Sequence, residues 1–317
     1  MKVVLAGGTG QVGLVLGRAF QAGGHDVVAL SRHPHTAPWR VVSWDAEDLG
    51  AWAVEFEAAD VVINLAGRNV NCRYSPDNRR LIMDSRVKST RVVGQAIARA
   101  AHPPRVWLQA STATIYAHRF DAPNDERSGI IGGDEPNAPN TWRFSIEVAK
   151  AWERAAMDVE VPHTRRVLMR SALTLSPDRG GIFSVLLGMV RFGLGGTVAG
   201  GRQYISWIHD QDFIRAVLWL IEHQELDGPV NLAAPNPMPQ AEFMRALRQA
   251  WGMPIGLPAT AWMAQIGALV LQTETELILK SRRVVPSRLQ EAGFTFQFPG
   301  WPEAAGDICA RWRRAGG

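Results

Sequence analysis

The chain has 317 residues, of which 46% are hydrophobic and 20% charged, proportions typical of a soluble globular protein. They exclude a disordered or collagen-like chain, and the length allows two domains. The net charge of +4 is small, and because the arginines are scattered rather than gathered in runs, we expect no nucleic-acid partner. The two cysteines, Cys72 and Cys309, form no metal-binding or redox motif, so we predict no metal site.

No membrane partner is expected either. The longest apolar stretches, around Gly181–Val190 and Ala261–Leu271, are shorter than the roughly 20 residues that cross a bilayer. Met1–Leu5 already has the pattern of a strand, so no signal peptide is expected ahead of the fold. With so few cysteines, these features favour a reduced, cytoplasmic location, and they leave the oligomeric state open.

Short strands and helices are predicted to alternate in the first half of the chain. Lys2–Ala6 is β-branched and apolar, and a glycine-rich turn and a helix to about Ala22 follow it. Further strands are expected at Asp26–Leu30, Arg40–Ser43, Asp60–Leu65, Arg105–Ala110 and Arg165–Leu173, and the two longest helices at about Pro76–Ala101 and Thr141–Met157. This alternation predicts an α/β fold with a Rossmann-type, doubly wound parallel sheet.

The second half is richer in glycine and proline. Helices expected at about Asp210–His223 and Gln240–Trp251 alternate there with short strands. We interpret residues 1–170 as a dinucleotide-binding domain and residues 171–317 as a smaller, mixed substrate-binding lobe. Some segments of this lobe are expected to return to the sheet of the first domain.

A glycine-rich motif lies between the first strand and the first helix. In Gly7-x-x-Gly10-x-x-Gly13, the first glycine allows a tight turn, the second lets the backbone approach a pyrophosphate, and the third lets the helix pack on the strand. The helix N-terminus offers free N–H groups to the phosphates. The predicted cofactor contacts in this loop are Gly7, Thr9, Gly10, Gln11, Val12 and Gly13.

The end of the second predicted strand favours NADP(H) over NAD(H). An acidic residue there would bind a ribose hydroxyl and repel a 2′-phosphate, whereas an arginine would pair with that phosphate. The stretch Ala29-Leu-Ser-Arg-His33 contains no acid, and Arg32 is placed to bind the phosphate. The alternative is that Arg32 is an ordinary solvated arginine.

Several motifs together resemble the extended short-chain dehydrogenase/reductase superfamily, and in particular its atypical epimerase branch with a distinctive C-terminal domain. The resemblance spans nearly the whole chain. It rests on residues 7–13, Ser31-Arg32, residues 61–67, Ser85-Arg86-Val87, residues 144–153, Arg170-Ser171, residues 193–196, residues 200–210 and residues 285–294. It implies an NADP-dependent epimerase or oxidoreductase.

The resemblance also implies positions for cofactor and substrate. Cofactor contacts are expected from Ser31 and Arg32 at the adenosine phosphate, from Asp45 near the adenine, and from Leu65, Ala66 and Gly67 after the fourth strand. Arg86 falls where extended members usually carry an asparagine in the active-site helix, and we assign it to the cofactor site. Thr112 falls at the position of the catalytic serine or threonine.

The usual catalytic pair of this superfamily is missing. In ordinary members a tyrosine, with a lysine four residues later on the same helical face, acts as the acid/base. The positions four residues after Tyr74, Tyr116 and Tyr204 hold Asn78, Phe120 and Ile208. The helix that should carry the pair has Phe144 near the tyrosine position. The atypical branch generally lacks the pair, so its absence supports the resemblance and removes the usual mechanism.

Three residues are candidates to replace it. Tyr116, in the loop after the fifth strand, is a possible proton donor, with a packed loop aromatic as the alternative. Glu147 would serve as a base if it were half-buried with a raised pKa, and the alternative is a surface or salt-bridged glutamate. Thr112 is either a hydrogen-bond donor to a substrate carbonyl or a cap at the end of its strand.

Substrate contacts are expected from the second half. Arg202 suits an anionic substrate group, with a flexible turn as the alternative. Trp207 is the tryptophan placed to stack on a flat ligand. His209 titrates near neutral pH and is a candidate substrate contact, unless it merely packs beside a helix capped by Asp210.

Two hypotheses for the function follow. The first is an NADP(H)-binding enzyme that transfers hydride between the nicotinamide and a carbonyl or carbinol carbon, either as an oxidoreductase or as an epimerase of a small, possibly nucleotide-sugar-like molecule. Both reactions need the same cofactor geometry, so the sequence leaves both open. The second is a non-catalytic NADPH-binding sensor or scaffold, which the missing pair suggests.

Overall fold

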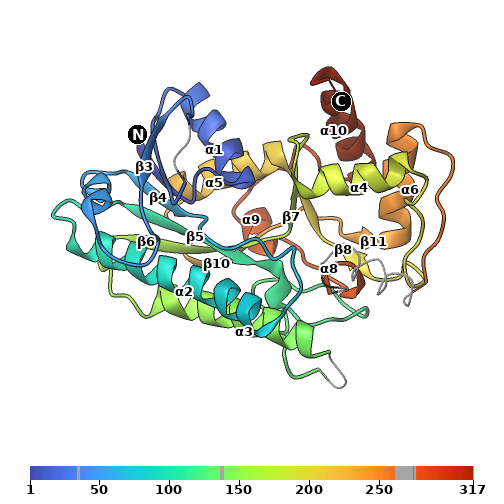
Figure 1. The fold of residues 1–317 in the computed structure, drawn as a ribbon, viewed down its shortest axis with the longest axis horizontal. Coiled ribbons are helices and arrows are strands. Elements are labelled where there is room, and N and C mark those ends of the chain that lie inside the picture. Colours follow the sequence, from blue (N-terminus) through green and yellow to red (C-terminus); the bar gives the residue numbers. More distant parts are fainter. Residues whose placement is uncertain (34–35, 136–138, 261–273, 275, 317) are drawn as a thin grey trace.

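The computed structural model describes residues 1–33, 36–135, 139–260, 274 and 276–316. In these residues the centre of the molecule is a seven-stranded parallel sheet in the order β10-β6-β5-β4-β1-β2-β3 (Figure 1). Its strands are β1 (Lys2–Ala6), β2 (Asp26–Ser31), β3 (Arg40–Ser43), β4 (Val61–Asn64), β5 (Val106–Thr112), β6 (Arg165–Ser171) and β10 (Gly228–Leu232). The predicted doubly wound α/β fold is confirmed.

Strands β1 and β4 are apolar except for Lys2 at the start of β1 and Asn64 at the end of β4, because both faces of the sheet are covered. The side chains of β1 and β4 from Val3 to Ala6 and from Val61 to Ile63 are completely buried. Helices α1 (Gln11–Ala22) and α5 (Asp210–Glu222) cover one face, and α2 (Pro76–Arg99) and α3 (Asn140–Met157) cover the other (Figure 1). The two long helices expected in the first half are therefore α2 and α3.

The second half builds its own core beside the sheet. Helices α4 (Ile182–Arg191), α6 (Gln240–Trp251) and α10 (Trp301–Arg314) lie together on one side of the sheet (Figure 1). Buried aromatic rings form part of the core between them. The Phe243 ring stacks on the Trp301 ring with centroids 4.1 Å apart. Two small sheets join this core, one from β7 (Leu173–Leu175) and β9 (Trp207–His209), the other from β8 (Tyr204–Ile205) and β11 (Met238–Pro239).

Segments from the second half also pack on the central sheet. Strand β10 pairs with β6, and Leu289 of α9 (Ser287–Glu291) and Phe294 share the core that α1 and α5 form on the sheet. The short elements η1 (Ala51–Phe56), η2 (Ala113–Ile115) and α8 (Glu276–Leu279) complete the described structure.

The structure differs from the sequence prediction at the end of β6. The single strand expected at Arg165–Leu173 is two strands, because β6 ends at Ser171 and β7 turns to pair with β9. The apolar stretch at 181–190 forms α4, whereas the stretch at 261–271 lies outside the described residues. Within the described ranges, no helix combines the length and the apolar character that a membrane span requires.

Candidate functional site

The glycine-rich loop has the backbone geometry that its motif predicts. Gly7 has a φ of +77°, and a Cβ there would lie 2.9 Å from Cα of Ala66. A Cβ on Gly13 would lie 2.6 Å from Gly8, so only glycine lets α1 pack this closely on the turn. Gly10, in contrast, has space for a Cβ, and no described side chain caps α1. The N–H groups of Gln11 and its neighbours are thus presented to a ligand.

The carboxyl ends of β2 and β3 lie beside this loop. The hydroxyl of Ser31 is buried and lies 2.9 Å from that of Thr9, while Arg32 is exposed. Asp45 is exposed beyond β3, and backbone N–H groups of Glu47 and Asp48 hold its pKa below the ordinary value. Arg32 is therefore positioned where an anion can reach it, at the edge that the sequence assigns to the adenosine.

The segment after β4 follows the same edge of the sheet. Leu65 donates its N–H to the carbonyl of Ala6 at 2.8 Å, and the N–H of Ala66 is bound by the side chain of Asn64 at 3.0 Å. A Cβ on Gly67 would lie 3.2 Å from Cζ of Arg86. These contacts place Leu65, Ala66 and Gly67 between the glycine-rich loop and α2.

A cavity of about 130 Å³ lies further along the carboxyl edge, beyond the end of β5. Helices α2 and α3 form its sides, and the 276–282 segment of the second half closes it. It is lined by Val70, Tyr74, Ile82, Arg86, Thr112, Thr114, Phe144, Ser145, Val148, Trp152, Glu276 and Arg282. Because all strands of the sheet are parallel, this cavity and the glycine-rich loop lie at the same edge.

One wall of the cavity is a chain of three polar groups. Tyr74 forms a hydrogen bond with Ser145, and Ser145 donates one to the carboxylate of Glu276. Burial raises the pKa of Tyr74 to about 12 and also raises the pKa of Glu276. The Tyr74 ring meets the edge of Phe144 with centroids 5.2 Å apart. The phenol is thus held protonated at neutral pH and connected to a buried carboxyl group.

Three cations surround this wall. A guanidinium nitrogen of Arg282 lies 3.5 Å from Glu276, and its Nε donates to the hydroxyl of Thr114 at 3.1 Å. Lys280 is 2% exposed and donates to the carbonyl of Thr114 at 2.8 Å, and burial lowers its pKa to about 8. Arg86 lies over the Trp152 ring, with Cζ 5.0 Å from the centroid.

Two of the three candidate catalytic residues lie away from this cavity. Tyr116 is buried in another network, where its hydroxyl donates to Asn231 at 3.0 Å and accepts from Arg170 at 2.9 Å. Arg170 is bound on its other side by Glu153, through two hydrogen bonds of 2.7 and 2.8 Å. Glu147 does not meet the condition of half-burial, because α3 turns it to the solvent-exposed face, and it corresponds to the alternative of a surface glutamate.

Thr112 is the candidate that does line the cavity. Its hydroxyl also accepts a hydrogen bond from the N–H of Thr114 at 3.2 Å, which caps the short helix η2. The two alternatives considered for Thr112 are therefore compatible, because the cap uses the hydroxyl as an acceptor and leaves its proton available.

The three residues proposed for substrate contact are not gathered at the cavity. Arg202 is exposed, with Cζ 5.9 Å from the Phe120 ring centroid. Trp207 is completely buried and packs against Trp301, with ring centroids 5.1 Å apart. A ligand-stacking position for Trp207 is thus not what the structure displays, because β9 turns this ring into the core of the second half.

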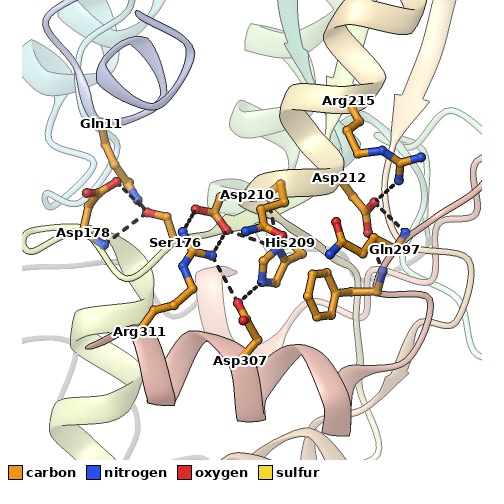
Figure 2. A network of polar contacts seen from close by, with 12 residues as sticks. Gln11, Ser176, Asp178, His209, Asp210, Asp212, Arg215, Gln297, Asp307 and Arg311 are labelled. Atoms are coloured by element: carbon orange, nitrogen blue, oxygen red, sulfur yellow. Dashed lines mark hydrogen bonds and ion pairs between the residues drawn. The ribbon is translucent and has the colours of Figure 1, made fainter. Parts of the chain in front are cut away.

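His209 belongs to a network that fixes the C-terminal helix (Figure 2). Its Nδ1 accepts from the N–H of Gln211 at 3.1 Å, so its Nε2 carries the proton shared with Asp307 at 3.0 Å. Burial lowers the pKa of this imidazole. His209 rather than Asp210 caps α5, and Asp210 instead binds Arg311 through two hydrogen bonds of 2.6 and 2.8 Å.

Sequence reasoning missed most of the polar wall. Tyr74 was counted among the tyrosines but was tested only for a lysine four residues later. Ser145 follows Phe144, at the position where the usual tyrosine was sought, and a search for any hydroxyl there would have found it. Glu276 and Arg282 carry no local signal, because they reach the cavity only through the return of the chain from the second half.

The fold, the glycine cradle and the cavity at the carboxyl edge together define a short-chain dehydrogenase/reductase of the atypical kind. The sequence matches the model of the NAD dependent epimerase/dehydratase family over residues 3–233, and that of a domain of unknown function, DUF1731, over residues 259–308. The chain therefore belongs to the NAD dependent epimerase/dehydratase family, and the resemblance deduced from its motifs is confirmed.

Similar proteins match nearly the whole length of this chain. The epimerase family protein SDR39U1 of Bos taurus is 32% identical over 98% of this chain and 100% of its own length, and the epimerase family protein ML0860 of Mycobacterium leprae (strain TN) is 31% identical over 93% and 91%. The crystal structure of human SDR39U1 (isoform2) with NADPH has a TM-score of 0.85 at 28% identity, covering 98% of this chain and 99% of that one. A nucleoside-diphosphate sugar epimerase from Corynebacterium glutamicum has a TM-score of 0.76 at 26% identity, and the match covers 98% of this chain and 58% of that longer chain.

Proposed function

We propose that this protein binds NADP(H) along the carboxyl edge of the sheet and transfers hydride between its nicotinamide and the carbonyl or carbinol carbon of a small molecule in the cavity. The observation that supports this most directly is the position of the cavity, whose polar wall lies at the same edge as the Gly7–Gly13 loop. Ligands of doubly wound sheets bind at this edge. The NADPH in the crystal structure of human SDR39U1 supports the same choice of cofactor.

The residues present fit a dinucleotide. The uncapped N-terminus of α1 and the open side of Gly10 suit the pyrophosphate, and the exposed Arg32 suits a 2′-phosphate. Asp45 would lie near the adenine, and Leu65, Ala66 and Gly67 would border the route to the cavity. The reduced dinucleotide, when bound, supplies the hydride. The preference for NADP(H) follows from Arg32 and from the absence of an acid at the end of β2.

In this proposal Tyr74 takes the role that the sequence assigned to Tyr116 or Glu147. During reduction, the phenol of Tyr74 donates its proton to the carbonyl oxygen as the carbonyl carbon receives hydride. Ser145 then gives its hydroxyl proton to the tyrosinate and takes one from the carboxyl group of Glu276. Burial favours the protonated forms of Tyr74 and Glu276, so both groups hold a proton that the reaction can use. Oxidation of a carbinol runs through the same groups in reverse.

The hydroxyl of Thr112 is the second donor available to the substrate oxygen. If the reduced or oxidised molecule is released, the protein is an oxidoreductase. If hydride returns to the opposite face of the same carbon, the protein is an epimerase, which is a kind of isomerase. The second half of the chain supplies Glu276 and Arg282, so we assign it the closing of the substrate site. Two unpaired cysteines, Cys72 and Cys309, support a cytoplasmic location.

The test is oxidation of NADPH by the purified protein in the presence of a panel of aldehydes, ketones and oxo acids. We expect saturable binding of NADPH and turnover with at least one carbonyl class. Tight binding of NADPH with no turnover across the panel, and no exchange of substrate hydrogen in the presence of NADP⁺, would favour the non-catalytic sensor or scaffold instead.

A further inference from the structure

Among the described residues that line the cavity, Arg86 is the cation without an acidic partner. In the described part of the chain, its guanidinium makes one hydrogen bond, from an Nη atom to the carbonyl of Ile82 at 3.1 Å, and no ion pair. The guanidinium also lies over the face of the Trp152 ring. Most of its five N–H donors are therefore left for a ligand.

The other charged groups of the cavity are already matched to one another. Glu276 accepts a hydrogen bond from Ser145 and lies 3.5 Å from a guanidinium nitrogen of Arg282. Glu276 and Arg282 are thus partners of each other on the closing segment. Arg86, on the opposite side of the cavity, has a carbonyl and an aromatic ring as its printed contacts and no such acidic partner among the described residues. Buried charges are ordinarily paired, and burial lowers the pKa of Arg86 to about 10.

The volume of the cavity limits the size of the ligand that could bind Arg86. It encloses about 130 Å³, whereas sites for drug-sized ligands enclose roughly 300 to 1,000 Å³. A nucleotide sugar is larger than this space. The apolar part of the lining, from Val70, Ile82 and Val148, suits a short aliphatic chain.

The reacting group and the anion must lie close together. Tyr74 and Arg86 line the same small cavity and interact electrostatically with each other. A molecule that engages both groups therefore carries its carbonyl near its negative charge. The planar fork of the guanidinium matches a carboxylate through two parallel hydrogen bonds.

We propose that the cavity binds a short oxo acid or hydroxy acid, with its carboxylate on Arg86 and its oxo or hydroxyl oxygen at Tyr74. The catalytic part of this assignment rests on the proposed function, whereas the binding part does not. It replaces the cofactor contact expected for Arg86 and the nucleotide-sugar-like substrate with a small carboxylate.

Calorimetric titration tests the binding part without turnover. The protein is first saturated with NADP⁺, which carries no hydride to donate, and is then titrated with 2-oxobutyrate or with butanone, which lacks the carboxylate. We expect 2-oxobutyrate to bind at least about tenfold more tightly than butanone, because charge-assisted hydrogen bonds to the guanidinium are strong. Equal affinities for the two compounds, or no detectable binding of 2-oxobutyrate, would overturn the proposal.

Three variants locate the effect. Arg86→Gln should lose the preference for 2-oxobutyrate, Arg86→Lys should keep part of it, and Arg80→Gln, an exposed position on the same helix, should leave it unchanged. Thermal melting and NADPH titration of each variant show whether it is folded. If Arg86→Gln fails to fold, the Arg86→Lys variant becomes the test. An unchanged preference of Arg86→Lys for 2-oxobutyrate over butanone would contradict bidentate binding of the carboxylate.

A loss of NADPH affinity in Arg86→Gln, with the preference for the acid retained, would show that Arg86 belongs to the cofactor site instead. Binding of 2-oxobutyrate with no reduction by NADPH would sustain this inference and count against the proposed reaction.

Discussion

Ser145 of α3 donates a hydrogen bond to Glu276 of α8, although the two residues are 131 positions apart in the sequence. Ser145 lies on a helix that covers the dinucleotide sheet, and Glu276 lies in the segment of the second half that closes the cavity. The polar wall next to Tyr74 therefore exists only when both halves of the chain are folded together. Four predictions follow from this arrangement and from the cofactor edge.

Tyr74→Phe removes the proposed proton donor and leaves the ring in place. We expect turnover to fall by roughly 10² to 10⁴, the usual contribution of a general acid, with NADPH affinity unchanged. Tyr116→Phe is the matched control. It should lower the free energy of unfolding by about 1–3 kcal/mol, because Arg170 and Asn231 each lose a buried partner, and it should retain turnover at low temperature. A Tyr74→Phe enzyme as fast as the unmodified protein would remove Tyr74 from the mechanism.

Gly10→Ala and Gly13→Ala separate cofactor binding from folding. Gly10 has a φ of −74° and space for a Cβ, so Gly10→Ala should fold normally and bind NADPH at least about tenfold more weakly, because the methyl group occupies the approach of the pyrophosphate. Gly13→Ala should instead lower the melting temperature, since its Cβ would lie 2.6 Å from Gly8. Melting curves and NADPH titrations measure both effects. Full NADPH affinity in a folded Gly10→Ala variant would show that the pyrophosphate does not approach this glycine.

Arg32→Ala tests the preference for the phosphorylated cofactor. We expect the affinity for NADPH to fall by about tenfold or more and that for NADH to stay the same, because only NADPH carries the 2′-phosphate. The loss should shrink at high salt, since Arg32 is exposed. The measurement is a pair of fluorescence titrations, with Arg18→Ala as the control at an exposed position of α1. Equal losses for the two cofactors would show that Arg32 does not read the phosphate.

Lys280 predicts a dependence of stability on pH. Burial lowers the pKa of Lys280 from 10.5 to about 8 in the folded protein, so between these two values the unfolded chain binds more protons. The contribution of Lys280 to the free energy of unfolding should therefore rise with pH from about 8 toward 10, by about 1–3 kcal/mol. Below pH 8 the lysine is protonated in both states, and the cost of burying its charge is fully present.

Urea unfolding at several pH values between 7.5 and about 10 measures this slope. Lys280→Met should flatten the slope, whereas Lys88→Met, at an exposed position, should leave it unchanged. Two buried groups have the opposite effect, because only the unfolded chain releases their protons: the thiol of Cys309 above about pH 9 and the phenol of Tyr74 above about pH 10. The slope is therefore compared between Lys280→Met and the unmodified protein, which share both groups. An unaltered slope in Lys280→Met would show that another group causes it.

Local patterns in the sequence were enough to predict the sheet and its cofactor edge. Some features depend mainly on residues that are close together in the sequence, and the spacing of apolar residues and glycines predicts such features well. They are the strand Lys2–Ala6, the glycine-rich loop after it and the long helices at 76–99 and 140–157. The structural requirement for glycine at Gly7 and Gly13 could be predicted because the close backbone packing at this turn excludes other residue types.

The cavity was not predictable in the same way. Tyr74 precedes its helix in an irregular segment, and Glu276 comes from a distant part of the chain, so no spacing rule joins them to Ser145. The burial of Trp207 and the choice between the two alternatives for His209 were not predictable for a related reason. Both residues lie in a stretch with the polar and aromatic character of a ligand site, but the second half uses them for its own core and for fixing α10.

The most direct test of the central claim is a crystal structure of this protein with NADPH. The account predicts the pyrophosphate on the N-terminus of α1, the 2′-phosphate at Arg32, and the nicotinamide ring facing the cavity that Tyr74, Thr112 and Arg86 line. A nicotinamide ring directed away from that cavity, or a ring that approaches Tyr116 instead, would contradict it.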